Sequence, residues 1–198
     1  MATLTAFDLA HTFTAKWEGG LADHPADPGG ITNFGVSLRF LQNFAQNQDN
    51  REWLARIGII LPINERAIRT LNADHARHIF KRFFWDGMKL DNLPLLTSIA
   101  TYDAAVNTGR GQSVKFLQRA CNTLPGERLE VDGLIGPKTY ARAQESKPDS
   151  LLAGLCINER DTFYKCLVSG KPNYSPFLQG WLNRIAALRK YIHNLGAV

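Results

Sequence analysis

Almost the whole sequence divides into stretches in which apolar residues recur every three or four positions. This spacing places apolar side chains along one face of a helix, so it predicts α-helices. The predicted helices cover residues 7–17, 38–48, 71–85, 95–106, 112–124, 137–144, 150–168 and 176–195. The apolar–polar alternation of a half-buried strand is scarce, and only residues 31–36 suggest a short extended pair. We therefore expect a mainly α-helical fold with little or no β-sheet.

Length and charge narrow the classes of protein further. At 198 residues, with 44% hydrophobic and 21% charged residues, the chain is long enough for one domain or two small lobes. No apolar run approaches the roughly 18–20 residues of a membrane span. The net charge of +5 is compatible with three anionic partners, namely nucleic acid, a membrane surface and a cell-wall polymer. Charge alone does not choose among them.

The charge is unevenly distributed along the chain. Residues 18–38 contain three acidic residues and no Lys or Arg. After Asp161 there is no acidic residue, whereas five Lys and Arg residues follow. One segment of the chain is therefore acidic while the rest has a net positive charge, which would suit an enzyme that is attracted to an anionic polymer.

Two features bear on the cellular compartment. The first twenty residues contain no basic stretch followed by an apolar one, so we expect no secretory signal. The cysteines are Cys121, Cys156 and Cys166, and the last two fall on one predicted helix, too far apart along its axis for a disulfide. We expect free thiols in a protein made in the cytosol.

A carboxylate-rich loop follows the first predicted helix. Glu18 stands beside an aromatic residue at the helix end, and Asp27 lies in a turn rich in Pro and Gly. Desolvation at the helix end should raise the pKa of Glu18, while a polar loop should leave Asp27 ionised. One protonated and one ionised carboxyl group are what glycoside hydrolysis needs. Gly29 and Gly30 would let a polysaccharide approach the backbone closely.

The same region contains a longer pattern, made of Glu18-Gly19-Gly20, Pro25-x-Asp27-x-Gly29-Gly30-x-Thr32 and Gly35-Val36. Further blocks follow, namely Phe84-Trp85, Tyr102-Asp103-Ala104-Ala105-Val106-Asn107-Thr108-Gly109, Leu117-Gln118-Arg119-Ala120 and Val131-Asp132-Gly133-Leu134-Ile135-Gly136-Pro137-Lys138-Thr139. Together these blocks resemble glycoside hydrolase family 108, which holds phage endolysins and secretion-associated muramidases, and its companion peptidoglycan-binding region.

The resemblance implies a lysozyme-like helical fold with two closely packed lobes. Residues 1–93 would form the catalytic muramidase region, and residues 94–198 the helical peptidoglycan-binding region. The implied reaction is cleavage of the β-1,4 bond between N-acetylmuramic acid and N-acetylglucosamine. Glu18 matches the general acid, Asp27 the second carboxylate, and Thr32 the hydroxyl that positions water.

Several details of this site stay open at the level of sequence. Ser37 carries a second hydroxyl that competes with Thr32 for the water, and Asp23 adds a third carboxylate. If the carboxyl groups of Glu18 and Asp27 are roughly 6.5–9.5 Å apart, hydrolysis would invert the configuration of the anomeric carbon. A separation of about 5–5.5 Å would retain it. The candidate substrate-binding residues are Trp17, Gly30, Ser37, Tyr102 and Asn107.

The chemistry implies no cofactor. Two metal-site alternatives exist. No HExxH or similar pair accompanies Asp23, His24 and Asp27. His75 and His78 are three residues apart on one predicted helix and could share a metal, although two histidines on a surface helix are far more common without one.

The expected partner is bacterial peptidoglycan, and we expect the protein to be a monomer. After synthesis in the host cytoplasm, a holin or a dedicated secretion partner would release the protein to act in the periplasm or cell wall. The alternatives are a non-catalytic peptidoglycan-binding or structural protein and a wall peptidase. Nucleic-acid binding is disfavoured because no recognised motif accompanies the charge.

Overall fold

The computed structural model describes residues 4–22 and 30–196. It divides into two compact units. The inserted unit is Thr14–Lys81, and the flanking unit combines Met1–Phe13 with Arg82–Val198. The chain therefore passes between the units twice, at 13/14 and again at 81/82.

Among its described residues, the inserted unit contains a two-stranded antiparallel sheet and four short helices. These are β1 (Thr32–Asn33), β2 (Val36–Ser37), α2 (Leu38–Phe44), α3 (Gln48–Arg56), α4 (Glu65–Arg69) and α5 (Ala73–Phe80). Each helix begins where the side chain of a capping residue accepts a hydrogen bond from a backbone N–H of the first turn. The caps are Ser37, Asn47, Asn64 and Asn72. The core is formed by buried apolar side chains that include Leu41, Leu54, Ile68 and Ile79.

All regular secondary structure among the described residues of the flanking unit is helical. Its α-helices are α1 (Ala6–Thr14), α6 (Leu95–Thr108), α7 (Arg110–Asn122), α8 (Pro137–Glu145), α9 (Asp149–Gly170) and α10 (Ser175–Gly196). Its short turns of other helix types are η1 (Lys81–Trp85), η2 (Asp86–Met88), η3 (Leu90–Asn92) and η4 (Pro172–Tyr174). α1 and η1 each contain one residue of the inserted unit.

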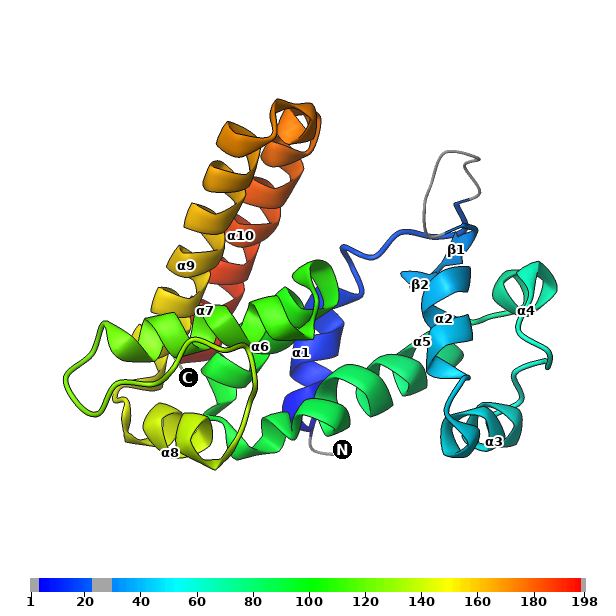
Figure 1. The fold of residues 1–198 in the computed structure, drawn as a ribbon, viewed down its shortest axis with the longest axis horizontal. Helices are drawn as coiled ribbons and strands as arrows, with labels where there is room; N and C mark the ends of the chain where they lie inside the picture. The colour runs from blue at the N-terminus through cyan, green and yellow to red at the C-terminus, as the bar shows by residue number, and fades with distance from the viewer. Residues whose placement is uncertain (1–3, 23–29, 197–198) are drawn as a thin grey trace. The chain divides into compact units, whose positions relative to one another are not determined.

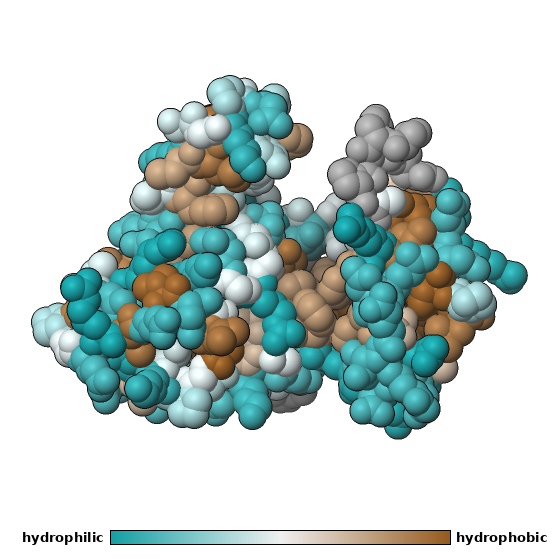
Figure 2. Space-filling view, in the orientation of Figure 1, coloured by the Kyte–Doolittle hydropathy of each residue, from teal (hydrophilic) through white to brown (hydrophobic). Residues whose placement is uncertain are grey.

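Helix α6 is the centre of the flanking unit, with ten successive buried residues from Leu96 to Ala105. Helices α7, α9 and α10 pack against it, and α9 and α10 run side by side as an antiparallel hairpin (Figure 1). Asp149 at the start of α9 caps α6, because its carboxylate accepts the N–H groups of Leu96 at 2.6 Å and Thr97 at 3.0 Å. A negative charge at this position also opposes the positive end of the α6 dipole. On the face drawn in Figure 2, hydrophilic side chains surround several apolar patches.

A buried ion triad links three helices of this unit. The carboxylate of Asp103 on α6 accepts hydrogen bonds from Arg160 on α9 at 2.6 Å and from Arg184 on α10 at 2.7 Å. Burial would raise the pKa of Asp103, but the two guanidinium groups outweigh it and lower that pKa below the ordinary value of 3.8. The triad therefore has a net charge of +1 in the core. Nη2 of Arg160 is buried and has no hydrogen-bond partner among the described residues.

The predicted mainly helical, lysozyme-like fold is confirmed, and the differences concern helix ends and two short helices, α3 and α4, that were not predicted. The first helix ends at Thr14 rather than at residue 17, because the N–H of Trp17 closes a tight turn on the carbonyl of Thr14. The helix predicted over 38–48 ends at Phe44, and α3 and α4 follow it. The helix predicted over 71–85 changes to a π-helical turn at Lys81, a turn that places the consecutive Phe84 and Trp85 both in the core.

The functional division at residues 93/94 stays a prediction. The compact units describe packing, whereas that boundary concerns which residues cleave and which bind. No helix among the described residues is both long enough and apolar enough to cross a membrane.

The three cysteines are free thiols, and two of them are buried. Burial raises the pKa of Cys121 to about 11 and raises the pKa of Cys156 well above its usual value, whereas Cys166 is exposed. Because the thiolate is the reactive form, we expect only Cys166 to react with a disulfide reagent in the native protein at pH 8. All three should react in denaturant. Spectrophotometric thiol counting checks this, and replacing Cys166 by Ser should abolish the native signal. A rapid second equivalent would contradict it.

Candidate functional site

Glu18 lies directly after the turn that ends α1, and its side chain is half-buried. Trp17 beside it is 37% exposed. Glu18 therefore follows the helix at a short distance instead of forming its last residue. A carboxyl group on such a segment needs contacts from other parts of the chain to hold it in place.

The β1–β2 hairpin supplies such a contact. Its two-residue turn has positive φ angles at Phe34 (49°) and Gly35 (77°), as the tight hairpin turns that match strand twist require. A Cβ atom at Gly35 would lie 2.8 Å from Oε2 of Glu18 and 2.9 Å from its Cβ. The side chain of Glu18 therefore lies directly on the turn, in a place that only glycine leaves open.

The hairpin is fixed in turn by a buried amide. Asn33 in β1 donates from its side-chain nitrogen to the carbonyls of Ile68 at 3.1 Å and Leu71 at 3.3 Å. Ile68 lies in α4 and Leu71 just after it, 35 and 38 residues further along the chain than Asn33. The amide thus ties the turn beneath Glu18 to the helical part of the inserted unit.

Thr32 occupies the middle of this small sheet. Its backbone pairs with Ser37 on β2 and, on the other side, exchanges two hydrogen bonds of 2.8 Å with Ala22. Its hydroxyl donates to the carbonyl of Gly30 at 3.3 Å. Asp27, together with Asp23 and His24, lies outside the described residues. Ala22 and Gly30, which flank that segment, are both hydrogen-bonded to Thr32.

The remaining candidates of the inserted unit have identifiable local roles. Gly30 has a positive φ of 70°, which suits glycine. The hydroxyl oxygen of Ser37 accepts the N–H of Phe40 at 3.2 Å and so caps α2. This capping uses one lone pair of Ser37, while its hydrogen remains available to an acceptor. The structure therefore places Thr32 and Ser37 on one hairpin and the side chain of Glu18 against its turn, and their catalytic roles stay predictions.

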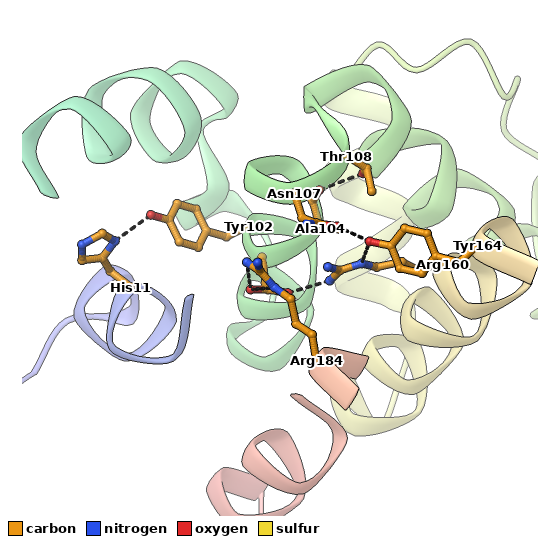
Figure 3. A network of polar contacts seen from close by, with 9 residues as sticks. His11, Tyr102, Ala104, Asn107, Thr108, Arg160, Tyr164 and Arg184 are labelled. Atoms are coloured by element: carbon orange, nitrogen blue, oxygen red, sulfur yellow. Dashed lines mark hydrogen bonds and ion pairs between the residues drawn. The ribbon is translucent and has the colours of Figure 1, made fainter. Parts of the chain in front are cut away.

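Tyr102 and Asn107 belong to the flanking unit (Figure 3). Tyr102 is fully buried, its ring packs edge-on against Phe7 and Trp85, and its hydroxyl lies 2.9 Å from Nδ1 of His11. This packing favours a supporting role. The exposed Asn107 accepts a hydrogen bond from the hydroxyl of Tyr164, which in turn accepts one from Arg160 at 2.9 Å. Substrate contact by either residue stays a prediction.

The histidines on α5 also have local partners. Nδ1 of His75 accepts the N–H of Asn72 and completes a capping box, and Nδ1 of His78 lies 2.8 Å from the carbonyl of Asp74. Among the described residues, no group of three His, Cys, Asp or Glu side chains is placed to hold a metal ion.

Two residues of the site, Asn33 and Phe34, do not stand out in the sequence. Phe34 is 38% exposed at the tip of the hairpin, next to the glycine that contacts Glu18. Bulky residues with positive φ are uncommon, and they are enriched at functional sites. The available signal was the run Thr-Asn-Phe-Gly-Val, in which Gly35 stands between two short extended pairs.

The contact between Gly35 and Glu18 gives a testable expectation. Replacing Gly35 by Ala should lower the free energy of unfolding by about 1 kcal/mol through the strain at positive φ. It should also displace the Glu18 carboxylate and so lower the hydrolysis rate by about 10²-fold, as a misplacement near 1 Å does. The measurements are urea unfolding and release of soluble fragments from purified cell walls.

Gly58→Ala is the matched control, because Gly58 also has a positive φ (87°) but its nearest atom, Nε2 of His75, would be 3.8 Å away. We expect Gly58→Ala to lose similar stability and to keep its activity. Equal activity in the two variants would mean that the turn does not position Glu18.

Comparisons with known proteins show which family the chain belongs to. The family model described as Glycosyl hydrolase 108 matches residues 11–109, and the one described as Predicted Peptidoglycan domain matches residues 112–186. No protein among the curated sequences matches the chain. The first match spans Glu18 and the whole hairpin.

Among solved structures, the chain is similar to Brucella abortus SagA. The two share 26% sequence identity with a TM-score of 0.73, over 95% of this chain and 94% of the other. The similarity therefore extends over both matched regions.

Proposed function

The chain belongs to the glycosyl hydrolase 108 family, and on that premise we propose that it is an N-acetylmuramidase. The family match and the second match to a peptidoglycan domain make it a glycoside hydrolase that acts on peptidoglycan. The proposed bond is the β-1,4 link between N-acetylmuramic acid and N-acetylglucosamine.

The observation that supports this proposal most is the contact of Glu18 with the Gly35 turn. A general acid must be held close to the oxygen that it protonates, and the hairpin holds this carboxyl group beside a partly exposed surface. In the proposed reaction, Glu18 donates its proton to the glycosidic oxygen as the bond to the anomeric carbon breaks. The leaving sugar then departs as an alcohol.

The second half of the reaction falls to Asp27 and Thr32. A water molecule adds to the anomeric carbon, Asp27 accepts one of its protons, and the Thr32 hydroxyl orients its oxygen. Support for Asp27 comes from the sequence pattern, and support for Thr32 also comes from its bonds to both flanks of the segment that contains Asp27. If Asp27 lies roughly 6.5–9.5 Å from Glu18, the product is inverted; at about 5–5.5 Å, Asp27 would instead form a covalent intermediate.

Mass analysis of wall fragments tests the proposed bond. Purified peptidoglycan digested by the full chain should yield disaccharide peptides that end in a reducible N-acetylmuramic acid. New amino groups without new reducing ends would identify a wall peptidase instead. Pelleting with the wall without any release would identify a non-catalytic binding or structural protein.

The remaining expectations concern the cellular setting. An endolysin role, a holin or secretion partner, a monomeric state and action in the periplasm or cell wall stay predictions.

A further inference from the structure

The flanking unit contains a groove of about 640 Å³ that none of the predicted site residues line. It lies between the turn around Gly87–Asn92, the first turn of α7 and the segment Gly133–Tyr140. Its volume falls within the range of small-ligand sites. Apolar patches lie among hydrophilic side chains over the region of α7 and α8 (Figure 2), and Leu134 at the groove is 72% exposed.

Side chains from α7 and α8 hold the first wall of the groove in place. Arg110 donates to the carbonyl of Gly87 at 2.8 Å, and the hydroxyl of Tyr140 donates to the carbonyl of Met88 at 2.8 Å. Gln144 donates to the carbonyl of Asn92 at 2.9 Å. Three side chains thus hydrogen-bond to carbonyls along the segment Gly87–Asn92 and fix this wall before any ligand binds. A ligand would therefore not have to order the wall on binding.

The opposite wall approaches α7 closely. Gly133 has a positive φ of 81°, and a Cβ atom there would lie 2.8 Å from the carbonyl oxygen of Gly111. The approach depends on glycine, and it sets the width of the groove between the Gly133–Gly136 turn and the start of α7.

The charged side chains that line the groove are all cationic. They are Lys89, which is exposed, and Arg110, which is half-buried with its guanidinium group 5.1 Å from the centre of the Phe83 ring. No acidic side chain is among the described residues that line it. The groove therefore combines apolar walls with positive charge, which favours a ligand that carries both apolar surface and carboxylates.

We propose that this groove binds the acidic peptide stem of peptidoglycan, a short peptide with free carboxylates. The proposal rests on the proposed function for the identity of the polymer, because a wall glycan presents such peptides beside the sugars that the enzyme cleaves. Lys89 and Arg110 bind the carboxylates, and the apolar walls contact the aliphatic side chains. The groove thereby adds affinity for the peptide to the affinity of the catalytic site for the glycan.

Calorimetric titration of the full chain with the free stem tetrapeptide L-Ala-γ-D-Glu-meso-diaminopimelyl-D-Ala tests this. We expect saturable binding that weakens as NaCl rises. Arg110→Met should weaken it by about tenfold and Lys89→Met by about fivefold. The milder Lys89→Met keeps the test valid if Arg110→Met disturbs the fold. A tetrapeptide with its carboxylates amidated should bind at least about tenfold more weakly.

Arg119→Met is the matched control for Arg110→Met, because both residues lie on α7 and both variants remove one positive charge. Arg119 is exposed and lies outside the groove. It should bind the tetrapeptide as the wild type does. No binding, equal binding by all variants, or equal binding of the amidated peptide would overturn the proposal. Binding of inorganic phosphate in place of the tetrapeptide would do the same and would indicate a phosphate-containing polymer.

A second substrate separates this proposal from the proposed function. Glycan strands stripped of their peptides should still be cleaved, and Lys89→Met should cleave them at the wild-type rate while losing activity on intact peptidoglycan at low concentration. If neither substrate is cleaved but the tetrapeptide binds, the muramidase proposal fails and the groove proposal stands. If both are cleaved and the tetrapeptide does not bind, the reverse holds.

Discussion

Replacing Glu18 by Gln should lower the rate of peptidoglycan hydrolysis by about 10³-fold while leaving the fold intact. The amide has nearly the same shape as the carboxylic acid, so its contact with the Gly35 turn persists, but it has no proton to give to the glycosidic oxygen. General acid catalysis contributes typically 10²–10⁴-fold. The measurement is the initial rate of reducing-end formation from purified walls, with the circular dichroism spectrum and the unfolding midpoint recorded alongside it.

Glu52→Gln is the matched control for this variant. It makes the same change at an exposed position on α3, where the side chain accepts a hydrogen bond from Gln48 that an amide oxygen also accepts. We expect its rate to stay within about twofold of the wild type, since isolated surface substitutions have small effects. A Glu18→Gln enzyme that keeps near-normal activity would remove Glu18 from the reaction.

Replacing Asp103 by Asn should destabilise the flanking unit by about 3–5 kcal/mol, because it removes the carboxylate that pairs with the buried guanidinium groups of Arg160 and Arg184. The pKa of Asp103 is lowered in the folded state, so its stabilising effect is present above its ordinary pKa. This effect is lost as the pH falls through the lowered value. The difference between wild type and Asp103→Asn should therefore be largest near neutral pH and should shrink in acid. Urea unfolding at several pH values measures it.

A surface ion pair on α9 provides the comparison. Asp161 lies 2.8 Å from Lys165 in an exposed pair one turn apart. Asp161→Asn should cost no more than about 0.5 kcal/mol, as exposed pairs do. Similar losses in the two variants would mean that the buried triad contributes no more than a surface pair does. Replacing all three triad members by apolar residues of similar volume should recover much of the loss.

The helical content was predictable from the sequence because amphipathic periodicity is a local property. The short extended pair around residues 31–36 was predictable for the same reason. The changes within helices were not. The π-helical turn at Lys81 depends on how Phe84 and Trp85 pack in the core, and periodicity does not contain that information.

The candidate site shows the same difference between local and long-range features. The Glu18 motif is contiguous and was visible in the sequence, whereas the parts that hold it are distant in the chain. Gly35 contacts Glu18 across a folded turn, and Asn33 binds carbonyls more than thirty residues away. For Tyr102 the resemblance predicted a part in substrate binding, which stays a prediction, and the structure adds that its side chain is packed and that its hydroxyl is bonded to His11. A sequence pattern identifies such a residue without showing what it touches.

The division of the flanking unit between both ends of the chain has a consequence for synthesis. Helix α1 is made early, but the hydroxyl of Tyr191 on α10 bonds to the carbonyl of Leu9 across 182 residues, and the ring of Tyr191 stacks on Phe13. The inserted unit is contiguous and is free to fold while the ribosome is still elongating the chain. Helix α1 must wait until α10 has emerged before these contacts form, and such long-range closure is slow. The contacts between α1 and α10 are therefore among the last to form during synthesis.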